Sequence, residues 1–342
     1  MNTKKSVNWI LSFALSLMIL SQFANAAPEL GEDYLKEYFN GSILIARDCK
    51  VLLRKGYGKA NFKKRISNTP TTIFRIGSLT KQFTAIAVLI LEEKGKLSTD
   101  EFISKYIPYP NGDKITIHNL LTHTSGIAEY FMSKELIESG NHYYSPEDLI
   151  NLFKNKPLNF TPGERFQYCN SNYILLGYII EKVSGLKYGD FIKENIFTPL
   201  DMKNSGYDSK TKFKDTAVGY YSIKPKLEEA IKLDMSIAYS AGGLYSTIDD
   251  LYKWDQALYT EIIVTKKTLS KMFTPGSQSN NYGYGWYGSV SDTLIFDIMY
   301  HTGAIQGFSS YIFRDIKKQI VIIMLSNEEG KNSSGYINMI RL

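Results

Sequence analysis

The stretch Thr80–Leu91 is apolar nearly all round. A helix with one apolar stripe would lie at a surface, whereas this pattern predicts a helix that is buried on several sides. Gly95 is expected to end it. Ser78 and Lys81 stand at its start, and side chains three residues apart share one face of a helix. We therefore expect the serine hydroxyl and the lysine amine to lie together.

Strand-like segments occur at both ends of the chain. Gly41–Ala46 and Val51–Tyr57 are expected to form a hairpin through the polar turn between them. Four further strands are expected in the last quarter of the chain: Tyr282–Tyr287, Leu294–Tyr300, Phe308–Arg314 and Gln319–Leu325. The intervening sequence favours helices and loops.

This order of elements predicts an α+β fold. One antiparallel sheet is built from both chain ends and flanked by helices, with a mostly helical region inserted between them. We expect a single domain over residues 27–342, with an α/β part at about 27–75 and 236–342 and a mostly helical part at about 76–235.

The first 26 residues have the three parts of a secretory signal peptide. Lys4 and Lys5 precede the apolar run Trp9–Leu20, and the small residues Ala24-Asn25-Ala26 follow it. The alternative is a retained membrane anchor, but the run is shorter than the roughly 18 residues that a span needs. We expect cleavage near Ala26 and an exported protein, either periplasmic or secreted, with no stable membrane span after the signal is removed.

Composition narrows the classes of protein. A hydrophobic content of 44% can form a sizeable core. Loss of residues 1–26 removes two lysines and no acid, so the net charge falls from +6 to +4. The densest basic run, Lys63-Lys64-Arg65, is typical of an exposed turn, so no nucleic acid is expected as a partner.

The histidines do not indicate a metal site. His118 and His123 are five residues apart with no acid between them, and His142 and His301 are isolated in sequence. We expect core or loop-anchoring roles for the first two, and neither a metal nor a cofactor. Cys49 and Cys169 could pair in an oxidising compartment, but buried free thiols are expected instead.

The spacing Ser-x-x-Lys occurs three times, so context must separate the copies. Ser184 precedes Gly185 at a helix end, and Ser209 lies in a lysine-rich loop. Only Ser78 opens a long buried helix. A serine beside an amine indicates covalent catalysis, because the amine can act as a base when it is desolvated or stabilise the alkoxide when it is charged.

Two later segments carry candidate groups for the same site. Tyr168-Cys169-Asn170 precedes a helix, and in an extended segment Tyr168 and Asn170 point the same way. His301-Thr302-Gly303 is expected at the end of a strand near the sheet edge. A phenol can relay protons, and an amide can hold either the lysine or the substrate.

Together, in this order, the three motifs resemble those of the serine β-lactamase and penicillin-binding protein superfamily. The resemblance is to its class C-like branch, which includes D-Ala-D-Ala carboxypeptidases, D-aminopeptidases and esterases. It covers nearly all of the mature chain through further similar stretches: Ile115–Ile127, Thr161–Gly185, Ala241–Trp254 and Gly303–Asp315.

The resemblance implies roles for the motif residues. Ser78 is the nucleophile that accepts the acyl group, Lys81 activates it, and Tyr168 is the general base and later the acid to the leaving group. Asn170 binds the substrate amide. The backbone N–H groups of Ser78 and Ala304 form the oxyanion hole, and the remaining substrate-binding positions are His301, Thr302 and Gly303.

His301 departs from the family pattern, since the β-lactamases and penicillin-binding proteins of this branch typically have lysine there. A histidine is largely neutral near pH 7, so it adds no fixed charge for a substrate carboxylate. This argues against strong β-lactamase activity.

Three functions remain open. The first is a serine peptidase, of the DD-carboxypeptidase or D-amino-acid peptidase type, that acts on cell-wall peptides such as peptidoglycan stem peptides and is able to bind β-lactams. The second is a carboxylesterase or a weak class C-like β-lactamase. The third is a non-catalytic sensor of penicillin or peptidoglycan on the same fold.

Overall fold

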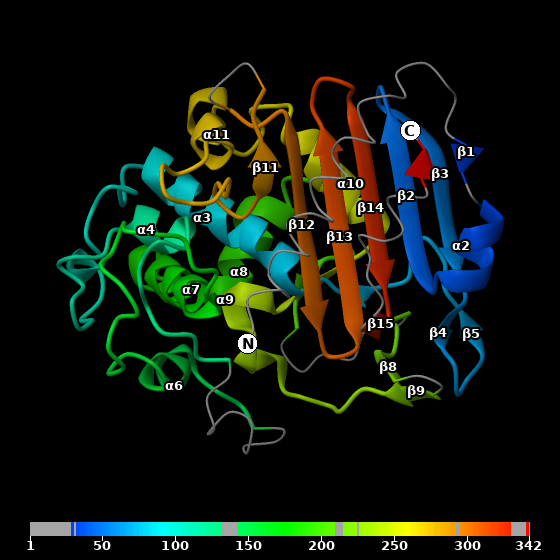
Figure 1. The fold of residues 1–342 in the computed structure, drawn as a ribbon, viewed down its shortest axis with the longest axis horizontal. Coiled ribbons are helices and arrows are strands. Elements are labelled where there is room, and N and C mark those ends of the chain that lie inside the picture. The colour runs from blue at the N-terminus through cyan, green and yellow to red at the C-terminus, as the bar shows by residue number, and fades with distance from the viewer. Residues whose placement is uncertain are drawn as a thin grey trace, which may run out of the picture. The chain divides into compact units, whose positions relative to one another are not determined.

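A six-stranded antiparallel sheet has the strand order β11-β12-β13-β14-β2-β3 (Figure 1). Its strands are β2 (Gly41–Arg47), β3 (Lys50–Tyr57), β11 (Tyr287–Ser289), β12 (Ile298–Ile305), β13 (Phe308–Asp315) and β14 (Ile320–Ser326). The register pairs Ile323 of β14 with Leu44 of β2, so the two ends of the sequence meet in the middle of the sheet. The predicted α+β fold is confirmed.

The computed structural model describes residues 29–30, 32–131, 142–208, 215–223, 226–291, 295–329 and 340–341. The expected signal peptide over residues 1–26 lies outside this part of the chain. The structure divides into a large unit, Asn40–Gly330, and a small unit formed by the terminal segments. In the small unit β1 (Glu29–Leu30) pairs with β16 (Ile340–Arg341), and α2 covers Glu32–Tyr38.

The β2–β3 hairpin turns at Asp48 and Cys49, which have left-handed φ values of 49° and 59°. Two consecutive left-handed residues match the twist of the flanking strands, as in a type I′ turn. Cys49 is exposed at this turn, so the prediction that its thiol is buried is wrong. Cys169 is buried as predicted, and its thiol contacts the carbonyl of Ile127 at 3.3 Å.

The long apolar stretch forms α3 (Thr80–Glu93), and every residue from Thr80 to Leu91 is buried. This helix contacts α7 (Asn170–Ser184), α8 (Tyr188–Ile192), α9 (Tyr239–Gly242) and α11 (Lys266–Met272). Neighbours on several sides explain why the stretch has no single apolar face. The prediction of a helix buried on several sides is confirmed.

The helical elements lie mainly beside the β11–β12 edge of the sheet, while α10 (Ile248–Ala257) packs against β14 and β2 (Figure 1). The other elements are short: β4 (Lys59–Asn61), β5 (Ile66–Ser67), β6 (Phe74–Arg75), η1 (Gly77–Leu79), η2 (Ile103–Lys105), α4 (Ile117–Leu121), α6 (Pro146–Asn151), η3 (Lys193–Phe197), β7 (Gly206–Tyr207), β8 (Tyr220–Ile223), β9 (Lys226–Glu229), η4 (Met235–Ile237), β10 (Leu244–Ser246) and β15 (Glu328–Glu329).

Two strand predictions need correction. The segment Tyr282–Tyr287 is mostly not a strand, because Gly285 has a left-handed φ of 78° and the N–H of Gly283 bonds the carbonyl of Trp286 in a tight turn. Pairing with β12 starts only at Tyr287, and Tyr282 forms no more than an isolated bridge with Tyr287. The strand that contains the His301 motif runs on to Ile305, so this motif lies within the strand rather than at its end.

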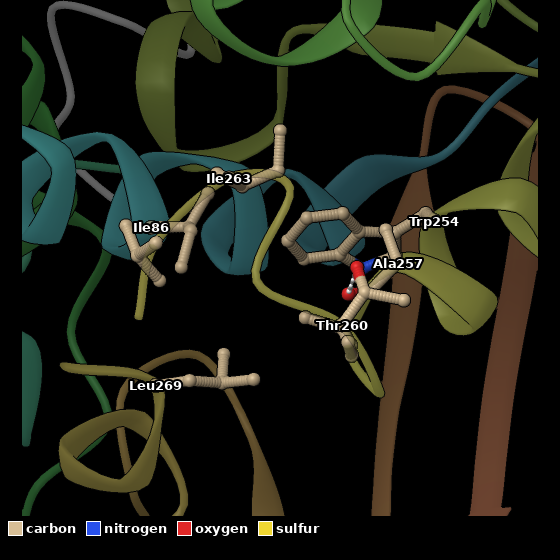
Figure 2. Close-up of a pocket in the computed structure, with 8 residues that line it drawn as sticks. Ile86, Trp254, Ala257, Thr260, Ile263 and Leu269 are labelled. Atoms are coloured by element: carbon tan, nitrogen blue, oxygen red, sulfur yellow. Dashed lines mark hydrogen bonds between the residues drawn. The ribbon is translucent and has the colours of Figure 1, made fainter. Parts of the chain in front are cut away.

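A small apolar cavity lies between α3, α10, the segment after α10 and α11 (Figure 2). Its lining includes Ile86, Trp254 and Leu269, and the Thr260 hydroxyl beside it is satisfied by the carbonyl of Ala257. Without a free polar group this cavity is a packing feature of the core. Within the described residues, no helix is long and apolar enough to cross a membrane.

Candidate active site

Ser78 lies in η1, directly before α3, with Lys81 in the first turn of the helix. The Lys81 Nζ is 3.1 Å from the Ser78 Oγ, 2.9 Å from the Asn170 Oδ1 and 2.8 Å from the carbonyl oxygen of Ala241. Lys81 is completely buried. The predicted proximity of hydroxyl and amine is therefore confirmed, and the lysine has three partners.

Burial lowers the pKa of Lys81 to about 7, while the negative charge of Glu129 acts in the opposite direction. A neutral amine has two N–H groups and one lone pair. With the N–H groups donated to Asn170 and Ala241, the lone pair of Lys81 faces the Ser78 hydroxyl. The amine can therefore accept the serine proton near neutral pH.

Tyr168 lies beside the same lysine, with its ring centroid 4.9 Å from the Lys81 Nζ. Burial raises the pKa of the Tyr168 phenol well above its ordinary value, although a hydrogen bond with the Ser78 side chain opposes this shift. The phenol consequently stays protonated at neutral pH. It is suited to donating a proton rather than to removing one.

Asn170 is the first residue of α7, and Glu129 holds it from outside the helix. The Glu129 Oε2 accepts the Asn170 backbone N–H at 2.7 Å and the Asn170 Nδ2 at 3.1 Å. With its nitrogen on the carboxylate, the amide presents its oxygen to Lys81. The charge and position of Glu129 thus determine how Asn170 is oriented.

His301, Thr302, Gly303 and Ala304 lie on β12, past the three residues with which β11 pairs. This part of the strand contacts η1 instead. A Cβ added to Gly303 would lie 3.1 Å from the Ser78 backbone nitrogen and 2.3 Å from the carbonyl oxygen of Ile76. Glycine therefore permits the strand to approach the serine backbone closely.

Gly77, which precedes Ser78, shows the same close approach between this segment and β12. Its φ is 50°, and an added Cβ would lie 2.9 Å from the backbone nitrogen of Ala304. The structure thus brings the backbones of Ser78 and Ala304 into one small region. Two backbone donors in such a region can stabilise an oxyanion.

The imidazole of His301 is buried, with its Nε2 3.1 Å from the Tyr282 hydroxyl and its Nδ1 2.6 Å from the carbonyl of Thr302. The carbonyl can only accept, so Nδ1 carries the proton and Nε2 accepts from the phenol. Burial and the nearby Lys81 charge lower the pKa of His301 to about 3. His301 is neutral at every ordinary pH.

Sequence reasoning missed several groups at this site. Glu129 lies in a loop without a motif; its only signal is that it is an acid two residues after the Gly126-Ile127 corner. Nothing in the sequence marks the carbonyl of Ala241, since every residue has one. Tyr282 was one of 25 tyrosines, and His123 was expected only to anchor a loop. Among the described residues, no cluster of three or more histidine, cysteine or acidic side chains could hold a metal.

Comparison with known proteins agrees with this geometry. The Beta-lactamase family model matches residues 33–339. A Bacillus subtilis (strain 168) protein named as a penicillin-binding protein, PbpX, is 39% identical over 312 residues, which cover 90% of this chain and 75% of that protein. The structure of a penicillin binding protein from Bacillus halodurans superimposes with a TM-score of 0.82 at 30% identity, covering 90% of this chain and 96% of that one.

A more distant structural neighbour is the D-amino acid amidase from Ochrobactrum anthropi SV3. It is 25% identical with a TM-score of 0.73, covering 90% of this chain and 94% of that one. The chain belongs to the Beta-lactamase family. It is a serine hydrolase of the serine β-lactamase and penicillin-binding protein superfamily, as its three motifs predicted.

Proposed function

We propose that this protein is an exported serine hydrolase that cleaves D-amino-acid peptides of the cell wall through an acyl-enzyme on Ser78, in the manner of a DD-carboxypeptidase, and that it binds β-lactams. One observation carries the proposal. The buried Lys81 amine, with its pKa lowered to about 7, lies 3.1 Å from the Ser78 hydroxyl.

In the first step neutral Lys81 takes the Ser78 proton while Oγ attacks the substrate carbonyl. The backbone N–H groups of Ser78 and Ala304 stabilise the resulting oxyanion. Asn170 and the Ala241 carbonyl keep the lone pair of the amine directed at the hydroxyl. The family resemblance also gives Asn170 the role of binding the substrate amide.

Tyr168 acts next, as the acid. Its phenol is protonated because its pKa is raised, so it can donate to the departing amine. Water then hydrolyses the acyl-enzyme, with the same groups moving protons in the opposite direction. The proposed mechanism assigns the role of first base to Lys81, whereas the family resemblance assigns it to Tyr168.

The proposed substrate class rests on His301 and on the relatives. A neutral imidazole supplies no cation for the carboxylate of a β-lactam, which argues against efficient β-lactam hydrolysis, and the carboxylate of a peptide would bind here without a charged partner at this position. Among the relatives, the name penicillin-binding protein is in keeping with β-lactam binding, and the name D-amino acid amidase is in keeping with substrates of D configuration. Export is proposed from the signal-like pattern of residues 1–26 alone.

The test uses the wild type and Ser78→Ala on four substrates: a fluorescent penicillin, a chromogenic cephalosporin, a short-chain nitrophenyl ester and a D-Ala-D-Ala peptide. Release of D-Ala with a stable penicillin label supports the proposal. Ester cleavage alone favours a carboxylesterase, and rapid loss of the cephalosporin favours a β-lactamase. A stable penicillin label without turnover of any of the four substrates favours a sensor. Full activity in Ser78→Ala would overturn the acyl-enzyme mechanism.

Export has its own test. The N-terminal residue of the protein recovered from outside the cytoplasm is expected to be Ala27. Protein that keeps residues 1–26 and sediments with membranes would instead support the retained anchor.

A further inference from the structure

Two features of His123 are energetically unfavourable, and its position next to the active site does not by itself explain them. Its φ is 57°, in the left-handed region that few residues other than glycine adopt. Its Nε2 is buried and has no hydrogen-bond partner among the described residues. An unpaired polar atom in the interior lowers the stability of a fold. Strain and an unpaired donor that persist in one residue suggest a functional gain.

His123 contacts several neighbours, among them the rings of Tyr173 and Tyr282, and it is hydrogen-bonded at two points to the segment that carries Tyr168. Its carbonyl accepts the N–H of Gln167 at 2.9 Å, and its Nδ1 accepts the N–H of Cys169 at 3.2 Å. The residues before and after Tyr168 are therefore both bonded to one histidine. The two rings also contact each other, with centroids 4.4 Å apart and planes 34° apart.

The direction of these bonds defines the state of the imidazole. A backbone N–H can only donate, so Nδ1 must be unprotonated, and the proton lies on Nε2. Asn172 adds a second donor to Nδ1 at 3.3 Å, and its amide is oriented by the Ser125 hydroxyl at 2.6 Å. Burial and the charge of Lys81 hold the pKa of His123 well below its ordinary value, so the acceptor persists across the working pH range.

We propose that His123 is a positioning residue that fixes the Tyr168 phenol for proton donation to the leaving group, by accepting the Cys169 amide at its Nδ1. This rests on the proposed function, in which Tyr168 is the acid. The left-handed φ and the unpaired Nε2 are the costs of this arrangement. In this conformation the Nδ1 of His123 bonds the residue after Tyr168, and the carbonyl of His123 bonds the residue before it.

The test compares His123→Phe with His123→Asn. Phenylalanine keeps a flat ring but has no acceptor. Asparagine tolerates a left-handed φ, and its Oδ1 can take the place of Nδ1. The control is His118→Phe, at the other histidine of the same segment, whose Nδ1 contacts the Tyr284 hydroxyl instead of the Tyr168 segment.

The readout is the ratio of the acylation rates for peptide and nitrophenyl ester, measured as leaving-group release in the first turnover, because deacylation moves its protons through Tyr168 with either substrate. A nitrophenolate leaves without an acid, whereas an amine does not, so loss of the acid harms peptide cleavage selectively. We expect His123→Phe to lower the acylation rate with the peptide about 100-fold and to change the ester rate and the peptide KM little, and we expect the same of Tyr168→Phe. In His123→Asn and His118→Phe the ratio is expected to stay near the wild-type value.

Two results would overturn the proposal. One is an equal fall of both rates in His123→Phe, which a merely structural role predicts. The other is a His123→Asn ratio as low as that of Tyr168→Phe, and this arm decides the matter if His123→Phe does not fold. The double variant His123→Phe/Tyr168→Phe should be no slower than Tyr168→Phe, because both changes remove one function. Additive losses would contradict this.

Failure of this inference can be told apart from failure of the proposed function. If the wild type shows no Ser78-dependent turnover of peptide or ester, the proposed function is wrong. If the wild type turns over both and the ratio in His123→Phe is unchanged, only the role of His123 is wrong.

Discussion

Glu129 accepts two hydrogen bonds from Asn170, one from the backbone N–H at 2.7 Å and one from the side-chain Nδ2 at 3.1 Å. The carboxylate has no proton to donate, so it binds only the nitrogen end of the amide. The oxygen end is thereby left for Lys81. A residue outside the three motifs thus determines how a motif residue meets the catalytic lysine.

Glu129→Gln should alter both the rate and its pH dependence. The glutamine can bind either end of the Asn170 amide, so kcat is expected to fall about tenfold or more. The Glu129 charge raises the pKa of Lys81, so its removal should shift the acid limb of kcat/KM to lower pH. The control is Glu147→Gln, an exposed acid that lies 3.8 Å from Lys182. An unchanged acid limb would contradict the electrostatic role of Glu129.

Lys81 should govern the acid limb itself. Because only the neutral amine is a base, kcat/KM of the wild type is expected to rise with pH through about 7. Lys81→Arg keeps the charge but cannot be deprotonated, and should lose about 10²–10⁴ in kcat/KM at pH 7.5. Retention of more than a tenth of the activity in that variant would show that another group takes the serine proton.

Lys81 should also link stability to pH. Its folded pKa is lowered below the unfolded value, so between about pH 7 and 10 the unfolded chain binds more protons. Stability of the wild type relative to Lys81→Met should therefore rise with pH in this window, by up to about 1.4 kcal/mol per unit. Urea unfolding at pH 6, 8 and 9.5 measures this difference. A flat difference would mean that Lys81 is protonated in the fold.

His301→Lys tests whether the neutral side chain at this position of β12 affects the binding of a charged substrate. A lysine there adds a positive charge, so the KM for a D-Ala-D-Ala peptide with a free carboxylate should fall about tenfold, while the KM for the C-terminal amide should not. His301→Gln is the neutral comparison. Equal KM changes for carboxylate and amide would show that this position does not read the charge of the substrate.

Gly303→Ala tests the close approach of β12 to the serine. The added Cβ would lie 2.3 Å from both the Ile76 carbonyl oxygen and the Ser310 Oγ, so the strand must move away from Ser78. We expect a loss of at least about 100-fold in kcat, as for other losses of an oxyanion-hole donor. Gly95→Ala is the control, because its φ of 65° is strained but its Cβ meets open space. Gly95→Ala should lower Tm and leave kcat/KM unchanged.

The sequence by itself determined the parts of this protein that depend on local pattern. The buried helix, the β2–β3 hairpin and the sheet drawn from both ends follow from apolar periodicity, because burial acts on each segment in the same way wherever it lies. Ser78 and Lys81 are three residues apart on one helix, so their proximity is a local property too.

Only the tertiary structure decided what surrounds them. The carbonyl of Ala241 in α9 accepts a hydrogen bond from Lys81, and Glu129, in a loop, binds Asn170; neither residue has a local signature. The pKa of Lys81 depends on desolvation by side chains from several elements, which no spacing encodes. His301 is a second example. Its neutrality was expected from the ordinary pKa of histidine, but its pKa of about 3 results from burial beside Lys81. Contacts between residues far apart in sequence arise from packing, and packing is a property of the whole fold.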